Sequence, residues 1–159
     1  MERTDEIVLR PIGVVTQGRA VVEDDNWGSV TAVIELDPER FPPDVTQGLS
    51  DFSHLEVIFF MHRVPPDAVD LHARHPRNNP DWPVVGIFAQ RPKARPNRLG
   101  LSRCRIVEVE GLRITVQALD AVVGTPIVDI KPYMREFAPI GEVRQPAWAS
   151  ELMRDYYRE

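Results

Sequence analysis

Apolar residues recur along the chain in short runs, which are typical of β-strands rather than of long helices. Every second residue is apolar across residues 30–36, so this segment predicts a half-buried strand. Residues 52–62 are apolar on both faces from Val57 onward, which predicts a central strand covered on both sides. A first strand is expected over residues 8–15, with Leu9, Ile12 and Val14 facing inward.

Two later segments, 99–110 and 112–119, flank a Glu-Gly turn and predict a β-hairpin. In the first arm the alternation shifts between Ile106 and Val107, which predicts a β-bulge. The inward face of the second arm is expected to hold Leu112, Ile114, Val116 and Ala118.

The apolar run at residues 84–88 predicts another buried strand, and two prolines then prevent the following RPKARPN loop from continuing a ladder. Near the C-terminus, Pro146 starts a helix predicted over residues 146–158, with an apolar stripe of Trp148, Leu152 and Tyr156. The fifteen prolines restrict other helices to short stretches. The pattern therefore predicts a mainly β protein with long loops and one C-terminal helix.

The chain has 159 residues, which suits a single domain, 1–159, with a substantial hydrophobic core. Its one cysteine, Cys104, excludes an internal disulfide framework and favours a reducing, cytoplasmic setting. The polar first ten residues lack the apolar core of a secretory signal, and no apolar run approaches the roughly 20 residues that span a bilayer. We therefore expect no membrane partner.

A basic stretch stands out in this acidic chain, whose net charge is −5. Between Asp81 and Glu108 there is no acidic residue, but there are six clustered cations: Arg91, Lys93, Arg95, Arg98, Arg103 and Arg105. This loop could bind an anion, or its arginines could simply be solvated. DNA is not an expected partner, and any nucleic acid would have to meet this local stretch rather than the average surface.

Several familiar motifs do not occur. There is no G-x-G-x-x-G, P-loop or G-x-S-x-G pattern. The acidic turn at residues 23–28 lacks the ligand spacing of an EF-hand, and His72 and His75 have no obvious third ligand, so we expect no metal site. Cys104 is interpreted as a small buried apolar residue rather than a nucleophile.

Three motifs together carry a resemblance to a known family. They are GLSDFSHLEVIFFMH at 48–62, VGIFAQRPKARPNRLGLS at 85–102 and LDAVVGTPIVDIKPYM at 119–134. From residue 12 to residue 134 the chain resembles the TsaA-like (YaeB-like) family of tRNA methyltransferases. The resemblance implies a closed or nearly closed β-barrel and S-adenosylmethionine as the cofactor. It also implies a homodimer with the cofactor near the subunit interface.

The resemblance places the cofactor against polar residues at predicted strand ends, and Asp25-Asn26-Trp27 stands where relatives have a P-R-Q segment. The implied cofactor contacts are Asn26, Trp27, His62, Arg63, Arg91, Leu101, Asp120, Val123, Gly124 and Thr125. An arginine can bind the carboxylate of S-adenosylmethionine through two hydrogen bonds, and Asp120 could meet its ammonium group. Methyl transfer mainly requires that the reacting atoms are held in line, and no catalytic base is assigned.

The methyl acceptor implied by the resemblance is N6 of threonylcarbamoyladenosine beside the tRNA anticodon. The candidate contacts to the acceptor or its phosphates are Arg95, Asn97, Arg98, Lys131 and Tyr133. Arg98 stands where relatives place a proline. Two alternatives for the function are an S-adenosylmethionine-binding regulatory module and a small-molecule methyltransferase.

Overall fold

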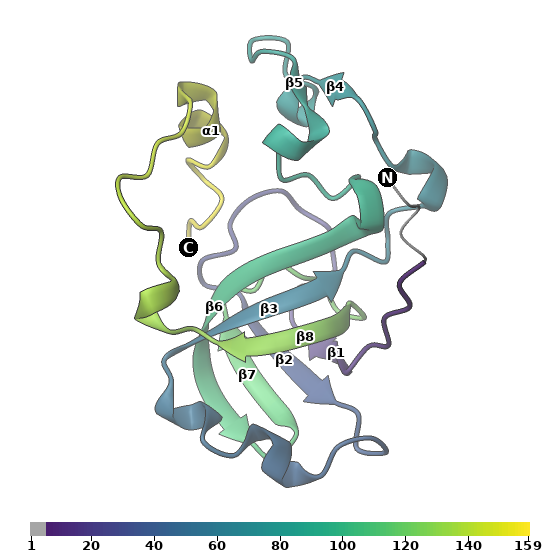
Figure 1. The fold of residues 1–159 in the computed structure, drawn as a ribbon, viewed down its shortest axis with the longest axis vertical. Coiled ribbons are helices and arrows are strands. Elements are labelled where there is room, and N and C mark those ends of the chain that lie inside the picture. Colours follow the sequence, from purple (N-terminus) through teal and green to yellow (C-terminus); the bar gives the residue numbers. More distant parts are fainter. Residues whose placement is uncertain (1–5) are drawn as a thin grey trace.

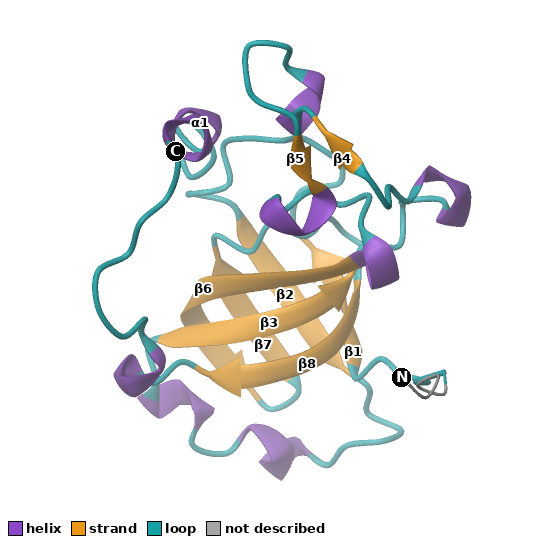
Figure 2. Ribbon diagram, turned by 45° about the horizontal axis from the view of Figure 1, so that its top comes forward, coloured by secondary structure: helices purple, strands orange, loops and turns teal. Residues whose placement is uncertain are grey.

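The computed structural model describes residues 6–159, and its main body is a closed barrel of six antiparallel strands (Figure 1, Figure 2). The order around the barrel is β1-β2-β7-β6-β3-β8. The strands are β1 (Gly13–Gln17), β2 (Thr31–Leu36), β3 (His54–Phe60), β6 (Leu99–Glu110), β7 (Arg113–Gln117) and β8 (Pro126–Pro132). The prediction of a mainly β, closed barrel is confirmed. The first five residues, part of the segment in which no secretory signal is expected, lie outside the described residues.

The remaining elements are short. Strands β4 (Ala73–Arg74) and β5 (Val85–Gly86) pair with each other in a separate sheet near one end of the barrel (Figure 1). The only α-helix of residues 6–159 is α1 (Ala147–Leu152). The 3₁₀ turns are Pro43–Thr46, Leu49–Asp51, Pro66–Ala68, Pro76–Asn78, Ile87–Ala89, Pro96–Arg98 and Arg135–Phe137. Within the described residues, no helix has the length and apolar composition needed to cross a membrane.

Strand β6 pairs with two neighbours along its two halves. Its first half pairs with β3, beginning with Leu99 opposite Phe60, and its second half pairs with β7. The β6–β7 register shifts between Ile106 and Glu108, so the predicted hairpin and its bulge are both confirmed. A bulge bends a strand and increases its twist, which helps one long strand follow the curve of the barrel.

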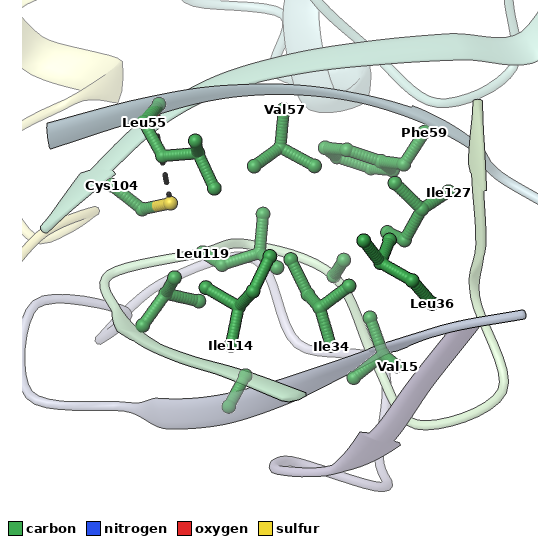
Figure 3. Close-up of a cluster of buried hydrophobic side chains, with 13 residues drawn as sticks. Val15, Ile34, Leu36, Leu55, Val57, Phe59, Cys104, Ile114, Leu119 and Ile127 are labelled. Atoms are coloured by element: carbon green, nitrogen blue, oxygen red, sulfur yellow. Dashed lines mark hydrogen bonds between the residues drawn. The ribbon is translucent and has the colours of Figure 1, made fainter. Parts of the chain in front are cut away.

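Side chains that alternate with outward-facing residues fill the barrel (Figure 3). The members with no exposed surface are Val15, Ile34, Leu55, Val57, Ile114, Val116, Leu119 and Ile127. Full burial of one such side chain stabilises the fold by about 1.5–3 kcal/mol. Cys104 belongs to this core, where its thiol donates to the Leu55 carbonyl at 3.6 Å, so its interpretation as a buried apolar residue is confirmed.

The prediction for the first strand is wrong in extent and in phase. Strand β1 begins only at Gly13, Leu9 is 53% exposed, and Val15 rather than Val14 is buried. Strand β8 pairs with Gly13 and Val14 of β1, and before them the Ile12 amide still donates to the Ile127 carbonyl of β8. Apolar spacing alone does not show where the pairing between β1 and β8 ends. The strand predicted over residues 30–36 is confirmed as β2, with its inward face buried.

The run at residues 84–88 is not a buried strand. Only Val85 and Gly86 pair, with β4, while Val84 is 56% and Phe88 is 78% exposed. Ile87 alone is deeply buried. The six barrel strands already close on one another, so no barrel edge is left for this segment to join.

Three other predictions need correction. The outer-face residues of β3 are half-buried rather than fully covered. Ala118 has a φ of +67°, which turns the chain out of the alternation, so Leu119 takes the buried position after Val116. The C-terminal helix ends at Leu152 rather than near residue 158, because the main chain beyond it hydrogen-bonds across residues 26–28.

The long connections gather at one end of the barrel, which we call the loop end (Figure 1). This end receives residues 18–30, 61–98 and 118–125, and the C-terminal residues fold back onto it. Leu119 and Ala121 are buried in one of these connections. Because irregular segments on a rigid scaffold often carry binding residues, the loop end is the expected place for a functional site.

Replacing Gly100 with alanine is expected to lower the free energy of unfolding by about 1–3 kcal/mol, the usual range for overpacking. A Cβ at Gly100 would lie 2.4 Å from ring atoms of the buried Phe59, directly across the β3–β6 ladder. The control is Gly86→Ala, because a Cβ there meets nothing within 4 Å. Urea unfolding of both variants checks this, and equal stability of the two would contradict the tight packing at Gly100.

Candidate functional site

The barrel register brings three of the predicted site segments together at the loop end. Phe60 at the end of β3 pairs with Leu99 at the start of β6, and Phe59 pairs with Ile127 near the start of β8. Three predicted parts of the site therefore lie at the same end of the barrel. Residues 62–63 follow the end of β3, residue 101 lies near the start of β6, and residues 120–125 precede β8. The basic loop, residues 91–98, leads directly into β6.

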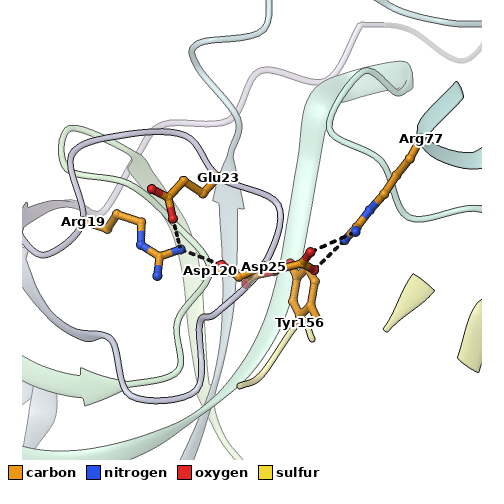
Figure 4. Close-up of polar contacts among 6 residues, drawn as sticks. All are labelled: Arg19, Glu23, Asp25, Arg77, Asp120 and Tyr156. Carbon is orange, nitrogen blue, oxygen red and sulfur yellow. Dashed lines mark hydrogen bonds and ion pairs between the residues drawn. The ribbon is translucent and has the colours of Figure 1, made fainter. Parts of the chain in front are cut away.

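Asp120 accepts side-chain hydrogen bonds from two separate segments at this end, one of them the segment that carries Tyr156 (Figure 4). Its Oδ1 accepts a hydrogen bond from the Ser102 hydroxyl, and its Oδ2 accepts one from the Tyr156 hydroxyl. Ser102 is buried on β6, and Tyr156 comes from the C-terminal segment. The carboxylate is thus held from two sides by hydroxyl donors.

Arg91 provides a positive charge near this carboxylate. Burial and the negative charge of Asp120 raise the pKa of Tyr156 well above its ordinary value, whereas the charge of Arg91 acts on it in the opposite direction. One Arg91 amine donates to the Leu101 carbonyl at 3.0 Å, and the side chain is exposed. An exposed guanidinium near a fixed carboxylate suits a ligand that carries both an anionic and a cationic group.

The turn before β8 lies beside His62. Gly124 has a φ of +89°, and a Cβ built on it would lie 3.5 Å from His62 Nε2. The Val123 and Gly124 amides donate to the Arg19 and Val15 carbonyls, which ties this turn to β1 and its exit. Burial and the charge of Arg63 lower the pKa of His62 from its ordinary value, so the imidazole is neutral at physiological pH.

Asn26 and Trp27 lie in the loop that connects β1 with β2. Asn26 has a φ of +65°, and Trp27 is only 3% exposed, with the Arg19 guanidinium 4.1 Å above its ring. A bidentate ion pair between Asp25 and Arg77 joins this loop to residues 61–98, the long connection between β3 and β6 (Figure 4). The buried indole is therefore part of the loop's own packing. The main-chain amides of both residues are used within the protein, so the exposed Asn26 side chain is what this segment can offer to a ligand.

The arginines of the basic loop make contacts within the protein. Arg95 donates to the Gln90 carbonyl at 2.8 Å, and Arg98 donates to the Val64 carbonyl at 2.6 Å while stacking over the Phe60 ring. Asn97 is exposed with a φ of +62°. Asn97 and Arg98 also line a largely apolar groove of about 1150 Å³, which lies toward β8 and the N-terminal residues.

The structure does not bring Lys131 and Tyr133 together with this loop. They lie at the exit of β8, where Leu55 near the start of β3 pairs with Pro132, at the opposite end of the barrel. Lys131 pairs with Asp129 at 3.0 Å, and the Arg103 guanidinium lies 4.9 Å from the Tyr133 ring centroid. A single acceptor surface containing all five predicted residues is therefore not formed within one chain.

His72 and His75 belong to the excursion that carries β4. His72 is exposed, and the His75 Nδ1 donates to the Trp82 carbonyl at 2.5 Å. Across residues 6–159, no group of three or more His, Cys, Asp or Glu side chains is placed to hold a metal ion.

A sequence model of the tRNA-methyltransferase O N-terminal domain matches residues 17–138. The chain belongs to this family. A protein from Methanothermobacter thermautotrophicus, named "Probable S-adenosyl-L-methionine-binding protein", is 32% identical over 86% of this chain and 96% of its own length. The human tRNA (adenine(37)-N6)-methyltransferase is 33% identical over 66% of this chain but only 23% of its own length. The chain also spans 44% of a Pseudomonas aeruginosa relative, RcsF, which is 38% identical over 106 residues.

Crystal structures of TrmO from Pseudomonas aeruginosa share the fold. Two of them superpose with TM-scores of 0.73 and 0.71 at 23% and 24% sequence identity. They cover 93% and 88% of this chain and 64% and 61% of their own chains. The barrel and its loop end are thus the architecture of the tRNA-methyltransferase O N-terminal domain.

Two residues of the polar cluster, Ser102 and Tyr156, were not among the predicted site residues. Ser102 is the last residue of the second motif, but its hydroxyl's partner comes from a segment 18 positions later. Tyr156 lies beyond the family match, and its four-residue spacing from Leu152 suggests only a helix stripe. Only the position of the C-terminal segment on the loop end shows its contact with Asp120.

Alkaline pH is expected to destabilise the protein through Cys104. Burial, with the charge of Asp120 adding to it, raises the pKa of this thiol to about 12. The unfolded chain loses this proton first, so the thiol's stabilising contribution is fully present below about pH 9 and is lost as the pH rises toward 12. Urea unfolding at about pH 8 and about pH 10 should reveal a loss of roughly 1 kcal/mol from this group.

Cys104→Ala is the control for this measurement. It removes the thiol but keeps Tyr156 and Tyr157, whose pKa values are also raised. The variant should lose less stability between the two pH values than the wild type does. An identical loss in both proteins would argue against a protonated, buried thiol.

Proposed function

We propose that this chain binds S-adenosylmethionine at the loop end and transfers its methyl group to N6 of threonylcarbamoyladenosine in tRNA. The observation that carries the proposal is that the exposed Arg91, which donates to the Leu101 carbonyl, and the fixed Asp120 carboxylate both act electrostatically on Tyr156 at the loop end, beside the His62–Gly124 turn. Membership in the tRNA-methyltransferase O family supports it, as do the relatives whose names state binding of this cofactor or methylation of tRNA adenine.

Each proposed residue is expected to contact one chemical group of the cofactor. Arg91 binds the carboxylate, and Asp120 accepts from the ammonium group. The exposed Leu101 side chain offers an apolar surface for the adenine ring. The carbonyls of Val123 and Gly124 and the exposed Asn26 side chain offer hydrogen bonds to its edge. His62 is neutral, so it adds no charge that would repel a sulfonium. The neighbouring Arg63 is exposed at the edge of the proposed site. S-adenosylmethionine itself supplies the electrophilic methyl group, and no general base is assigned.

The tRNA acceptor is proposed to meet the basic loop. Arg95, Asn97 and Arg98 lie in one 3₁₀ turn and its entry, next to the cofactor residues along the chain. Their positive charge contrasts with the net charge of −5 of the whole chain, so contacts with phosphates would be local. Lys131 and Tyr133 stay predictions, and within one chain they would contact a separate part of the RNA.

A second candidate function is an S-adenosylmethionine-binding regulatory module. The archaeal relative that matches this chain over nearly its whole length is named only for cofactor binding. In addition, Arg95 and Arg98 already use part of their guanidinium groups on backbone carbonyls. A small-molecule methyltransferase would use the same cofactor site. The homodimer and the cytoplasmic location stay predictions.

Arg91→Ala is expected to weaken S-adenosylmethionine binding by roughly 10- to 100-fold, the range for losing a hydrogen-bonded ion pair. Titration calorimetry measures this. Arg105→Ala is the matched control, since Arg105 is exposed on the same strand as Leu101 but four residues further along. Wild-type protein that does not bind the cofactor, or an Arg91→Ala variant that binds it as tightly, would remove the proposed cofactor site.

Purified protein with S-adenosylmethionine is expected to methylate tRNA that carries threonylcarbamoyladenosine and not tRNA that lacks this modification. Mass spectrometry of the nucleosides measures the product. The double variant Arg95→Ala, Arg98→Ala should lose most of this activity and show a weaker dependence of RNA affinity on salt. Its control is Arg113→Ala, whose exposed ion pair with Glu35 contributes little.

The result separates the candidate functions. Cofactor binding without a methylated nucleoside in any tRNA would favour the regulatory module. Full activity of the double variant would show that the basic loop does not contact the acceptor.

A further inference from the structure

The C-terminal segment, residues 153–158, is built into the loop end by main-chain hydrogen bonds. The amides of Asn26, Trp27 and Gly28 donate to carbonyls of Asp155, Tyr156 and Arg158 at 3.0, 2.8 and 3.2 Å. These residues lie outside the family match, which ends at residue 138. The docking is therefore seen in the structure and not in the family match.

Gly28 allows the two segments to approach closely. A Cβ at this position would lie 2.0 Å from the Tyr157 carbonyl oxygen, so any other residue would force the backbones apart. A second anchor lies at the end of α1, where the Trp82 indole donates to a Glu151 carboxylate oxygen at 2.7 Å. Contacts from two connections, the one between β1 and β2 and the one between β3 and β6, thus fix the C-terminal segment in one place.

In this position the Tyr156 hydroxyl donates a hydrogen bond to the Asp120 carboxylate. Its pKa lies above the ordinary value because of burial and the charge of Asp120, so the phenol keeps its proton and remains a donor at physiological pH. Ser102 donates to the other oxygen of the same carboxylate. A carboxylate has about four acceptor sites, so two donors fix its orientation and leave capacity for a ligand.

We propose that Tyr156 is a positioning residue of the ligand site: its phenol orients the Asp120 carboxylate to accept the ammonium group of S-adenosylmethionine, and the C-terminal segment forms one wall of that site. This inference rests on the proposed function. The three main-chain bonds and the close fit at Gly28 favour a permanent wall over a segment that leaves when the ligand enters.

Tyr156→Phe is expected to weaken S-adenosylmethionine binding by roughly tenfold, because a hydrogen bond to a charged group is lost. Titration calorimetry should compare it with Tyr157→Phe, a neighbouring tyrosine that is 48% exposed. In the Asp120→Asn background, Tyr156→Phe should cause little further loss, since Tyr156 acts through that carboxylate. Thermal unfolding and circular dichroism check that each variant is folded.

A second ligand separates positioning from a general loss of structure. Methylthioadenosine contains the adenosine and thioether parts but no amino-acid group, so its affinity should be equal in the wild type and Tyr156→Phe. Equal weakening of both ligands would mean that Tyr156 only supports the wall, and this would overturn the positioning role.

Two other results would also overturn it. Unchanged or tighter S-adenosylmethionine binding by Tyr156→Phe would show that the phenol does not assist binding or competes with the ligand. If Asp120→Asn still weakens binding in that case, the proposed function stands although the positioning role does not. If the wild-type protein does not bind S-adenosylmethionine, the proposed function and this inference both fall.

Discussion

Closure of the barrel between β1 and β8 is the constraint on which the rest of the structure depends. The ladder at this seam is short, with only Gly13 and Val14 paired to β8. It is extended by hydrogen bonds between Val15 and residues 124–125, in which Val15 donates to the Thr125 carbonyl and accepts from the Gly124 amide. The turn that closes the barrel is therefore also the turn that faces His62. Since Gly124 needs a left-handed backbone there, the barrel seam and the site depend on the same glycine.

The arginines at the loop end stabilise irregular backbone as well as providing charge. Arg95 and Arg98 donate to the main-chain carbonyls of Gln90 and Val64, which lie outside the ladders, and Arg91 donates to the Leu101 carbonyl near the start of β6. Buried or partly buried carbonyls need such donors, and a guanidinium can satisfy them while keeping other N–H groups for a ligand. Arg98 follows Asn97 in a left-handed turn, with φ values of +48° and +62°, a conformation that proline cannot adopt. The positive charge of the loop is therefore held close to the barrel by these contacts.

The elements predicted correctly from the sequence are those set by local patterns. The β6–β7 hairpin, its bulge and strand β2 follow from alternation and a turn glycine. The failures come from long-range pairing. The run at residues 84–88 is apolar, but the closed barrel leaves it no edge, and β1 has its phase set by β2 and β8. Of the residues predicted for the site, Arg91, Asp120 and Gly124 lie at the loop end, whereas Trp27 has its ring buried in the loop and Lys131 lies at the other end.

Tyr156 shows why a site can exceed its motifs. Asp120 comes from the connection before β8, Ser102 from β6 and Tyr156 from the chain end, so three distant segments set the direction of one carboxylate. No periodicity links them, because the C-terminal segment is placed by main-chain bonds to residues 26–28, and main-chain bonds leave almost no mark on side-chain patterns. The exception is a residue whose side chain must be absent. Gly28 is such a residue, and it is the one sequence feature that the docking of the C-terminal segment strictly requires.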